Sequence, residues 1–218
     1  EHISGDGIRH LKPSIDTLGH FARSIEDLEL MRCALTDDTP VNFSDEYTLP
    51  KTIGICKTGE WHAAQNEVIS MIGKVKECLT SSNTRVEEVI LPNEFTDVMN
   101  RSFQVIYSWE LRAAHEKEIE DHLEEFNPWF QWAVDYAKEL TETDFDEAIL
   151  EAKNVRAILD DIFREVDVIL TPSALGEAPI DLTEIPKNNF NNLWTLMYVP
   201  CLNLPLFLGP NDLPVGLQ

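Results

Sequence analysis

The sequence predicts an α/β fold in which a mixed β-sheet is flanked by helices. A strand–helix–strand pattern spans about residues 51–92, a mainly helical segment follows over about residues 94–166, and short strands with one helix return over about residues 167–218. Strands that alternate with helices are typical of sheets that contain parallel strands. No linker-like stretch separates these parts, so we expect residues 1–218 to belong to one domain with a helical insertion.

A first helix is predicted to begin at Ser24. The Ser24 side chain can cap the first turn, and Asp27 takes the place of the acid in a capping box. Apolar residues then recur every three or four positions and form one apolar face: Ile25, Leu28, Met31 and Leu35. The stretch TDDTP is expected to end this helix.

The strand–helix–strand pattern is the clearest local unit. The stretch KTIGICK alternates and is rich in β-branched residues, which is typical of a strand, and RVEEVILP predicts a second strand. Between them an amphipathic helix is marked by Trp61, Ala64, Val68, Met71, Ile72, Val75 and Leu79. This pattern predicts parallel strands with a right-handed crossover.

The remaining elements follow in order. Helical periodicity runs from Glu94, is broken at Asn127-Pro128, and resumes to about Val166. DVILTP predicts a short buried strand, and the Pro-rich SALGEAPIDLTEIP a surface loop. NNFNNLWTLMYV predicts a helix, PCLNLPLFLG a fully buried strand, and LPVGLQ the start of another strand.

Composition excludes some partners. The net charge of -22, with only 17 Lys and Arg, argues against nucleic acid, which needs a basic surface. The most apolar run, LWTLMYVPCLNLPLFLG, is interrupted by Pro200, Asn203 and Pro205 and is too short for a membrane span, so no membrane partner is expected. We interpret the acidity, including the paired acids, as solvated helix faces and turns.

The four cysteines lie far apart, without a CxxC pair or zinc-like spacing. Cys56, Cys78 and Cys201 sit in apolar stretches, which predicts buried free thiols in a reducing compartment. The first residues, EHISGDGIRH, are polar and do not resemble a signal peptide. We therefore expect a cytoplasmic protein.

Sequence motifs for catalysis are absent. There is no GxSxG, GxGxxG, phosphate loop or HExxH, and the nine glycines stand singly, so no Gly/Ser-rich oxyanion loop is present. No cofactor and no catalytic residue is predicted within these residues.

Three weaker candidates can be weighed. His115, Glu118 and His122 share a helix face and could bind a metal, but a solvated acidic face is the favoured interpretation. Lys12 and Ser14 could form a Ser–Lys pair, but no oxyanion donors accompany them. The aromatic group Trp129, Phe130 and Trp132 forms either core or a pocket wall, and core is favoured.

Four stretches, in order, resemble the amidase signature family. SIDTLGHFARS is similar to its S-x-D-T-x-G-x-x-A-R-S/T phrase, and TIGIC with VEEVILP to its strand–helix–strand. DVILTPS resembles D-x-x-L-T-P-T, and LWTLMYVPCLNLPLFLGPNDLPVGLQ resembles the closing W-T-x-L-x-V-P-C and L-P-V-G-L-Q motifs.

The resemblance implies hydrolysis of a carboxylic amide. In that family a serine nucleophile acts with a second serine in a cis peptide and a lysine as the ultimate base. None of these three residues can be matched to a position here, because the family carries them before the first of the four stretches. We therefore expect the C-terminal portion of an amidase, without its Ser-Ser-Lys residues and inactive alone.

The resemblance also implies supporting roles for eight residues. Four residues match the S-x-D-T-x-G-x-x-A-R phrase and would support the neighbouring catalytic loop: Asp16, Thr17, Gly19 and Arg23. Of these, Asp16 and Arg23 would hold that loop by hydrogen bonds and an ion pair. Residues expected near a small-molecule amide substrate are Thr171, Pro172, Trp194 and Tyr198. An ordinary turn with a helix cap remains the alternative for the first group. Tyr198 stands where relatives commonly have Gly or His, and His20 where many have Pro, which leaves the substrate open.

Two further functions remain as alternatives. The chain could be a non-catalytic acidic interaction domain derived from the amidase fold, or an enzyme that uses unrecognised residues. A sheet without the strands of the catalytic half is expected to leave an apolar edge and face uncovered. We therefore expect a homo-oligomer, association with the missing catalytic half, or a rearranged core.

Overall fold

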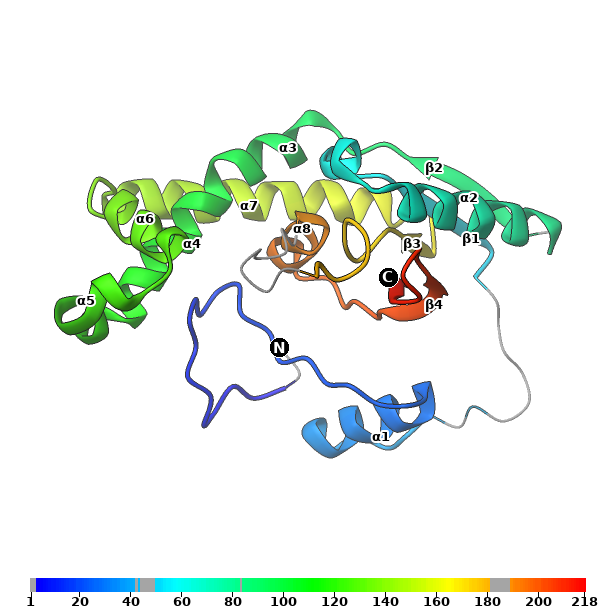
Figure 1. Cartoon of the computed structure of the whole chain (residues 1–218), viewed down its shortest axis with the longest axis horizontal. Helices are drawn as coiled ribbons and strands as arrows, with labels where there is room; N and C mark the ends of the chain where they lie inside the picture. Colours follow the sequence, from blue (N-terminus) through cyan, green and yellow to red (C-terminus); the bar gives the residue numbers. More distant parts are fainter. Residues whose placement is uncertain (1–2, 42, 44–49, 83, 181–188) are drawn as a thin grey trace.

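The computed structural model describes residues 3–41, 43, 50–82, 84–180 and 189–218, and Figure 1 shows their arrangement. Strands β1, β2 and β3 form one parallel sheet in the order β2-β1-β3, and β4 and β5 form an antiparallel pair. The elements are α1 (Ile25–Thr36), β1 (Thr52–Cys56), η1 (Gly59–Ala63), α2 (Asn66–Ser81), β2 (Arg85–Val89), α3 (Asn93–Asn100), α4 (Ser102–Ala114), α5 (Glu116–His122), η2 (Leu123–Glu125), α6 (Pro128–Ala137), α7 (Glu142–Ile162), β3 (Val168–Leu170), α8 (Asn189–Met197), β4 (Leu204–Leu208) and β5 (Pro214–Leu217).

Backbone hydrogen bonds join the two sheets into one mixed β-sheet. Beyond the end of β3, Thr171 and Gln218 exchange two backbone hydrogen bonds of 2.9 Å, and the Ser173 N–H donates to Gly216 O at 3.1 Å. These bonds place β5 beside the continuation of β3, which gives the order β2-β1-β3-β5-β4. The predicted α/β fold with a mixed sheet is confirmed, and α2 connects the parallel pair β1 and β2 as expected.

Strand β1 is central because its two neighbours pair with it from either side. All five of its residues are buried. Asp167, just before β3, fixes the start of β1: its Oδ2 accepts hydrogen bonds from the backbone N–H groups of Lys51 and Thr52, each at 2.8 Å. Gly54 is required in mid-strand, since a Cβ there would lie 2.5 Å from Val89 Cγ2.

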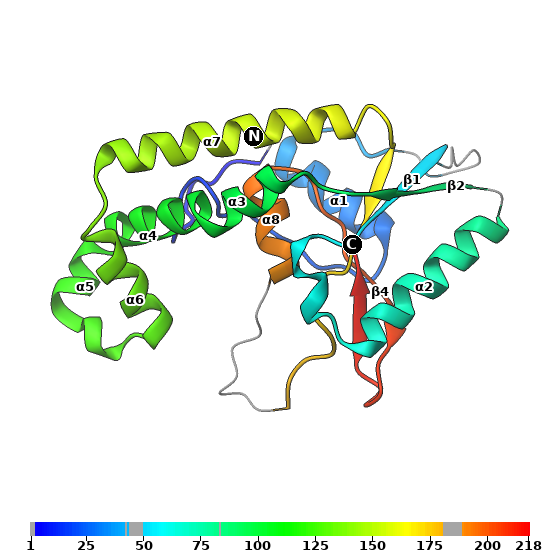
Figure 2. The same ribbon diagram turned by 90° about the horizontal axis from the view of Figure 1, so that it is seen from above.

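Helices cover both faces of the sheet, as Figure 2 shows. On one face, α2 packs Val68, Met71 and Ile72 against Ile55 and the two buried residues of β5. On the other face, α3, α4, α7 and α8 form the larger core, which includes Cys56. The sheet therefore has an apolar core on each of its two faces.

Local sequence explains the helical segment. Asn127 caps α6 by accepting from the Phe130 N–H at 2.9 Å, and Pro128 occupies the first turn, so the predicted break lies at this place. Thr141 and Asp144 form a reciprocal capping box that begins α7. The buried residues of α7 recur at intervals of three or four: Ala148, Ala152, Val155 and Leu159.

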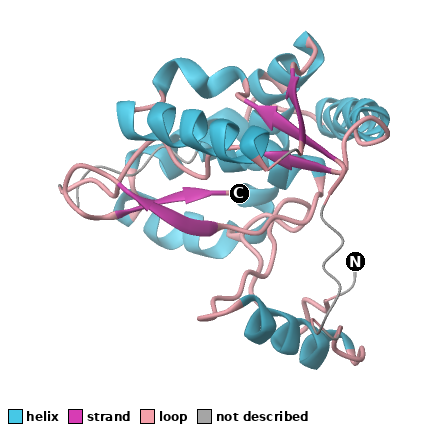
Figure 3. Ribbon diagram, turned by 90° about the vertical axis from the view of Figure 1, so that its right-hand side faces the viewer, coloured by secondary structure: helices cyan, strands magenta, loops and turns pink. Residues whose placement is uncertain are grey.

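Helix α1 begins where the sequence predicts, since Ser24 Oγ accepts from the Asp27 N–H at 3.1 Å. Asp37 ends it with a left-handed φ of 57°. Its apolar face, however, is not covered: Ile25, Met31 and Leu35 are each nearly half exposed. Figures 1 and 3 show α1 apart from the sheet and from the other helices.

Three predictions about the strands and the βαβ helix are wrong. The stretch LPLFL forms β4 but is not fully buried, because Leu206 and Leu208 are 61% and 66% exposed. Strand β3 is only partly buried, with Val168 exposed. The helix expected from Trp61 begins at Asn66, because the separate short helix η1 precedes it. Part of the predicted Pro-rich loop, residues 181–188, lies outside the described residues.

The predictions about the cysteines are partly wrong as well. Cys56 is buried, and burial raises the pKa of its thiol to about 11. Cys78 and Cys201 are exposed, whereas Cys33 is buried. Cys78 lies in the last turn of α2, beyond the last buried residue of this helix, Val75. Among the described residues, no helix is both long enough and apolar enough to cross a membrane.

Glu151 on α7 ties this helix to the junction of α3 and α4. Its Oε2 accepts hydrogen bonds from Arg101 Nη2 at 2.8 Å and from the hydroxyl of Ser102, which is buried. These bonds, that of Arg101 above all, favour the carboxylate and lower the pKa of Glu151.

We expect Glu151→Gln to change the pH dependence of stability. Because the folded-state pKa is lower than the unfolded one, the ionised side chain stabilises the fold above the unfolded pKa of about 4.3, and this stabilisation is lost as pH falls through the folded pKa. At pH 7 the substitution should lower the free energy of unfolding by about 1–3 kcal/mol, with little difference from wild type in strong acid. Urea unfolding over a pH series measures the loss of stability at pH 7 and the difference that remains in strong acid. Substitution of the exposed Glu165 by Gln is the control. A pH profile parallel to that of wild type would contradict the expected role.

Candidate functional site

The predicted substrate residues Thr171 and Pro172 lie at the seam between β3 and β5, at the carboxyl end of β3. Thr171 is buried and held through its backbone by Gln218, whose Nε2 also lies 3.3 Å from Pro172 O as a hydrogen-bond donor. In open α/β sheets, ligands bind outside the carboxyl ends of the strands. The seam is therefore a suitable place for a substrate.

Gly216 brings two polar side chains to this seam. A Cβ at this position would lie 2.2 Å from Ser173 Oγ and 2.3 Å from Asn203 Oδ1. Contacts this short do not occur, so only glycine lets both side chains approach the backbone of β5. The glycine of L-P-V-G-L-Q thus has a structural reason, and Ser173 and Asn203 are neighbours of the seam that the sequence did not single out.

Two buried polar atoms near the expected substrate positions lack partners. Neither Thr171 Oγ1 nor Trp194 Nε1 has a hydrogen-bond partner among the described residues. Trp194 itself is 3% exposed and packs in the larger core with Leu193 and Met197. An unpaired buried donor or acceptor costs about 1–3 kcal/mol, so a partner from outside the described residues would stabilise either atom.

Tyr198 lies directly after α8 and has a left-handed φ of 60°. Tyr198 is 53% exposed, and its ring packs against the guanidinium of Arg156 on α7, with 3.5 Å between Arg156 Cζ and the ring centroid. Arg156 Nε also donates to Leu196 O at 2.8 Å. A left-handed backbone favours glycine, and the cation–π contact offsets part of the strain of the tyrosine at this position.

Asp16 stabilises its own loop. Its Oδ2 accepts hydrogen bonds from the backbone N–H groups of Leu11 at 2.5 Å and Lys12 at 2.9 Å, and Lys12 Nζ lies 3.6 Å from Oδ1. The loop is attached to α4, because the Ser14 N–H donates to Glu110 Oε2 at 3.0 Å. Asp16 therefore shapes the turn at the start of the SIDTLGHFARS stretch.

The other members of this group point outward. Thr17, Gly19 and Arg23 are exposed, and Arg23 forms no hydrogen bond or ion pair with any described residue. Their role beside a catalytic loop stays a prediction. Lys12 is engaged with Asp16 and lies 4.7 Å from the Tyr107 ring centroid, which does not favour a Ser–Lys pair with Ser14.

The structure does not form the metal site considered for His115, Glu118 and His122. His115 is buried with its Nδ1 3.4 Å from Arg9 Nη2, whereas His122 pairs with Glu125 at 3.1 Å. The bond from Arg9 lowers the pKa of Glu118, so this carboxylate is already engaged by a cation. Within the described ranges, no three His, Cys, Asp or Glu side chains are placed to bind a metal.

The aromatic group on α6 is only partly core. Phe130 is buried, but Trp129 and Trp132 are nearly half exposed and stack on each other with centroids 4.6 Å apart. The prediction of core is therefore correct for one ring of three. The spacing of the three residues could not decide this, because neighbouring positions on a helix face different directions.

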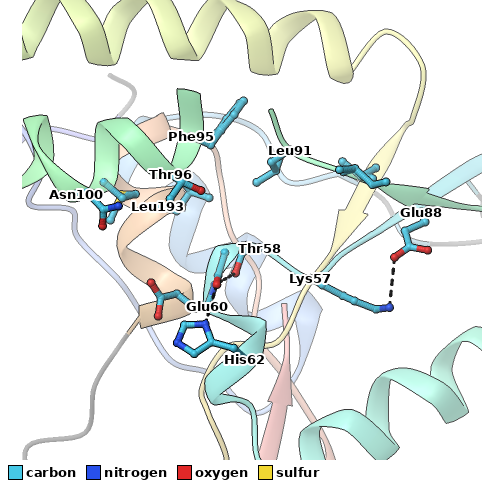
Figure 4. A pocket seen from close by; sticks show the side chains of 14 residues that line it. Lys57, Thr58, Glu60, His62, Glu88, Leu91, Phe95, Thr96, Asn100 and Leu193 are labelled. Carbon is cyan, nitrogen blue, oxygen red and sulfur yellow. Dashed lines mark hydrogen bonds and ion pairs between the residues drawn. The ribbon is translucent and has the colours of Figure 1, made fainter. Parts of the chain in front are cut away.

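A cavity of about 440 Å³ lies at the carboxyl ends of β1 and β2 (Figure 4). It is lined by residues of the segments 57–62, 88–91 and 95–100 and by Leu193 of α8. None of the four predicted substrate residues lines it. One signal could have found it, since Lys57 and Thr58 directly follow a buried strand of a parallel sheet.

Comparison with known proteins identifies relatives over the whole chain. The family model Amidase matches residues 1–218. The chain is 24% identical over 263 residues to a mitochondrial glutamyl-tRNA(Gln) amidotransferase subunit from Anopheles gambiae, with 99% of the chain and 53% of that protein covered. It is 23% identical over 237 residues to 2-amino-5-chloromuconic acid deaminase of Comamonas testosteroni, covering 98% and 49%.

The fold is similar to a crystal structure of an amidase, with a TM-score of 0.83 and 26% identity. That match covers 100% of this chain and 51% of the other. The chain thus spans about half the length of the relatives it matches. A family match over every residue, together with this fold, shows that the chain belongs to the amidase family.

Proposed function

We propose that this chain forms one side of the active site of a carboxylic amide hydrolase. The substrate would lie at the β3–β5 seam, near Thr171, Pro172, Trp194 and Tyr198. The serine nucleophile and the lysine base would come from a segment outside these 218 residues. Membership in the amidase family and the match to about half of each relative support this division.

The unpaired Thr171 hydroxyl carries the proposal. It is buried at the carboxyl end of a strand, beside a β5 backbone that Gly216 leaves open to Ser173 and Asn203. The hydroxyls of Ser14 and Ser108 also lack partners among the described residues, but that of Thr171 lies at the carboxyl end of a strand, where a substrate or a neighbouring loop would complete the site. A hydroxyl can donate to a carbonyl oxygen or accept from an amide N–H, so it suits an amide.

The chemistry expected of the intact enzyme is acyl transfer. A serine oxygen attacks the amide carbonyl, the amine leaves after it gains a proton, and water then releases the acid. The role of this chain would be to hold the amide so that its carbonyl meets the nucleophile. In the absence of that second segment, we expect no turnover.

The uncovered apolar surfaces support a partner segment. β4 lies at the edge of the mixed sheet, with Leu206 and Leu208 exposed, and the apolar face of α1 is exposed as well. Exposed sheet edges and apolar patches are typical of surfaces that another segment covers. We infer that the catalytic segment covers them, either in the same polypeptide or in an associated one. The buried free thiols of Cys33 and Cys56 further favour a cytoplasmic setting.

Labelling of the natural gene product with a fluorophosphonate probe tests this function. We expect one reactive serine, which peptide mapping places outside residues 1–218, together with hydrolysis of at least one member of a panel of small amides. Thr171→Val should raise KM, because the hydroxyl is proposed to contact the substrate. The yield of labelled serine should stay close to that of the wild type, because the hydroxyl does not contact the nucleophile.

Two results would overturn the proposal. A labelled serine within residues 1–218, with amide turnover, would show that unrecognised residues of this chain catalyse the reaction. A gene product with neither labelling nor turnover would instead support the non-catalytic acidic interaction domain.

A further inference from the structure

One side chain ties the loop that follows Thr171 and Pro172 to the turn between β4 and β5. Glu177 Oε1 accepts hydrogen bonds from the backbone N–H groups of Asn211 and Leu213, each at 3.0 Å. Its Oε2 accepts a hydrogen bond from Asn211 Nδ2 at 2.8 Å. Three donor groups of this turn therefore converge on a single carboxylate.

The turn leaves space for this carboxylate at Gly209. The Gly209 N–H donates to Leu213 O at 2.9 Å, and Asp212, with a left-handed φ of 59°, donates its N–H to Gly209 O at 3.2 Å. A Cβ on Gly209 would lie 2.5 Å from Glu177 Cδ, a contact too short to exist. A larger residue at this position would therefore displace the carboxylate, which is the flexible end of its side chain.

Glu177 is ionised at neutral pH. Partial burial raises the pKa of its carboxyl group, but the hydrogen bonds from Asn211 and Leu213 outweigh burial and hold the pKa below its usual value. An ionised carboxylate only accepts hydrogen bonds and so suits three donors. A glutamine that keeps its oxygen at the two backbone N–H groups would turn its NH₂ group toward Asn211 Nδ2, which is another donor.

The backbone of the same loop is anchored on α2. The Gln65 N–H, at the N-terminus of α2, donates to Leu175 O at 2.8 Å, and the Glu177 N–H donates to Glu67 Oε1 at 3.4 Å. Helix α2 itself packs on Ile55 of β1 and on β5. The loop is thus fixed through its backbone, and the Glu177 side chain connects the β4–β5 turn to this anchor.

Glu177 also closes the open end of the β3–β5 seam. Backbone hydrogen bonds between Thr171 and Gln218, and from Ser173 to Gly216, hold the seam together. In the described part of the chain, no backbone hydrogen bond joins residues 174–180 to residues 209–215. The carboxylate supplies the next link between these segments. Its loss leaves the Ser173–Gly216 bond at a free end, where local opening begins.

We propose that Glu177 is a positioning residue for the substrate. It acts through the β4–β5 turn and keeps β5, with Gly216, in register beside Thr171. Its effect reaches the amide through the backbone of the seam and not through direct contact. This inference rests on the proposed function, because the β3–β5 seam is where that function places the amide.

Hydrogen exchange of the natural gene product tests whether Glu177 holds the seam. Glu177→Gln should raise the exchange rates of the Thr171 and Gln218 amides on the order of tenfold, while the amides of β1 exchange as in the wild type. Gly209→Ala displaces the carboxylate without changing its charge and should have the same effect. The exposed Glu165→Gln, an equal change of charge beyond the end of α7, is the control and should leave the seam unchanged.

A reversal of polarity tests the side-chain bond itself. Asn211→Asp places two carboxylates together and should also raise exchange at the seam. In the double variant Glu177→Gln with Asn211→Asp, the amide at position 177 can donate to the carboxylate at position 211, so exchange should return toward the wild-type rate. A general effect of charge or of instability would not give two single changes that open the seam and a pair that restores it.

Kinetics test the role in substrate binding. Glu177→Gln should raise KM for small amides about three- to tenfold, and the double variant should recover the wild-type KM. The kcat and the yield of serine labelled by the fluorophosphonate probe should change less than about twofold, because the nucleophile is not held by this turn. A merely structural defect would lower the yield of labelled serine together with the activity.

Three results would overturn the inference: seam exchange unchanged by Glu177→Gln or by Gly209→Ala, a double variant no better than the two single variants, or a seam that opens while KM stays at the wild-type value. Absence of turnover by the wild type would instead count against the proposed function. The exchange rates would then still decide whether Glu177 holds the seam.

Discussion

Replacing Trp194 by alanine is expected to lower the free energy of unfolding by about 3–5 kcal/mol. The indole is 3% exposed and lies in the core that unites α3, α4, α7 and α8, so its removal leaves a cavity shared by four helices. Such a loss is a large part of the total stability of a domain of this size, commonly about 5–15 kcal/mol. Urea unfolding followed by circular dichroism measures it.

Two controls separate packing from hydrogen bonding. Trp194→Phe keeps an aromatic ring and removes an N–H that has no partner in the described part of the chain, so the loss should stay within about 1 kcal/mol. Trp132→Ala removes an indole that is nearly half exposed and should cost about 1–1.5 kcal/mol, mainly through lost stacking. A Phe variant as unstable as the Ala variant would show that the N–H is bonded in the folded protein.

Substitution of Leu206 and Leu208 together by lysine is expected to weaken self-association of the chain on the order of 100-fold. The two side chains are two positions apart on β4 and so share one face of an edge strand, and both are mainly exposed. In the variant, an interface that covers these two positions has less apolar contact and must bury two lysine charges on each chain. Sedimentation and light scattering measure the association, and binding of a hydrophobic dye should fall in parallel.

A matched double variant provides the control. Ile69→Lys with Leu150→Lys changes charge and apolar content equally, but these residues lie on separate helices, α2 and α7. This variant should associate like the wild type. A wild-type chain that is a compact monomer without dye binding would contradict the expectation of an uncovered apolar edge.

The sequence predicts local features of this fold well where one residue type decides the structure. Ser24 caps α1 as predicted, and Asn127 caps α6 at the predicted break, because a short polar side chain satisfies free N–H groups of the first turn. β1 is recognisable by its β-branched residues, and it is buried at every position because it is the central strand of a parallel sheet. The family resemblance rests on such stretches and is confirmed.

Burial and the cavity could not be predicted in the same way. Apolar periodicity shows which face of α1 is apolar but not which segment covers that face. In the same way, the apolar stretch around Leu206 predicts a strand but not what packs against its side chains. The cavity is lined by residues as far apart in the sequence as Lys57 and Leu193, and no spacing reveals that they meet. The left-handed φ of Tyr198 was likewise hidden, because tyrosine is not the residue that such a backbone favours.

The pairing of β1 with β3 has a consequence for biosynthesis. Asp167, just before β3, and Thr52, at the start of β1, are joined by a hydrogen bond although they are 115 positions apart, and the whole helical segment lies between them. At about 5–20 residues per second, a ribosome needs about 6–23 s to supply the second strand after the first. During that interval the apolar stretch TIGIC is a target for chaperones and a risk for aggregation of the nascent chain.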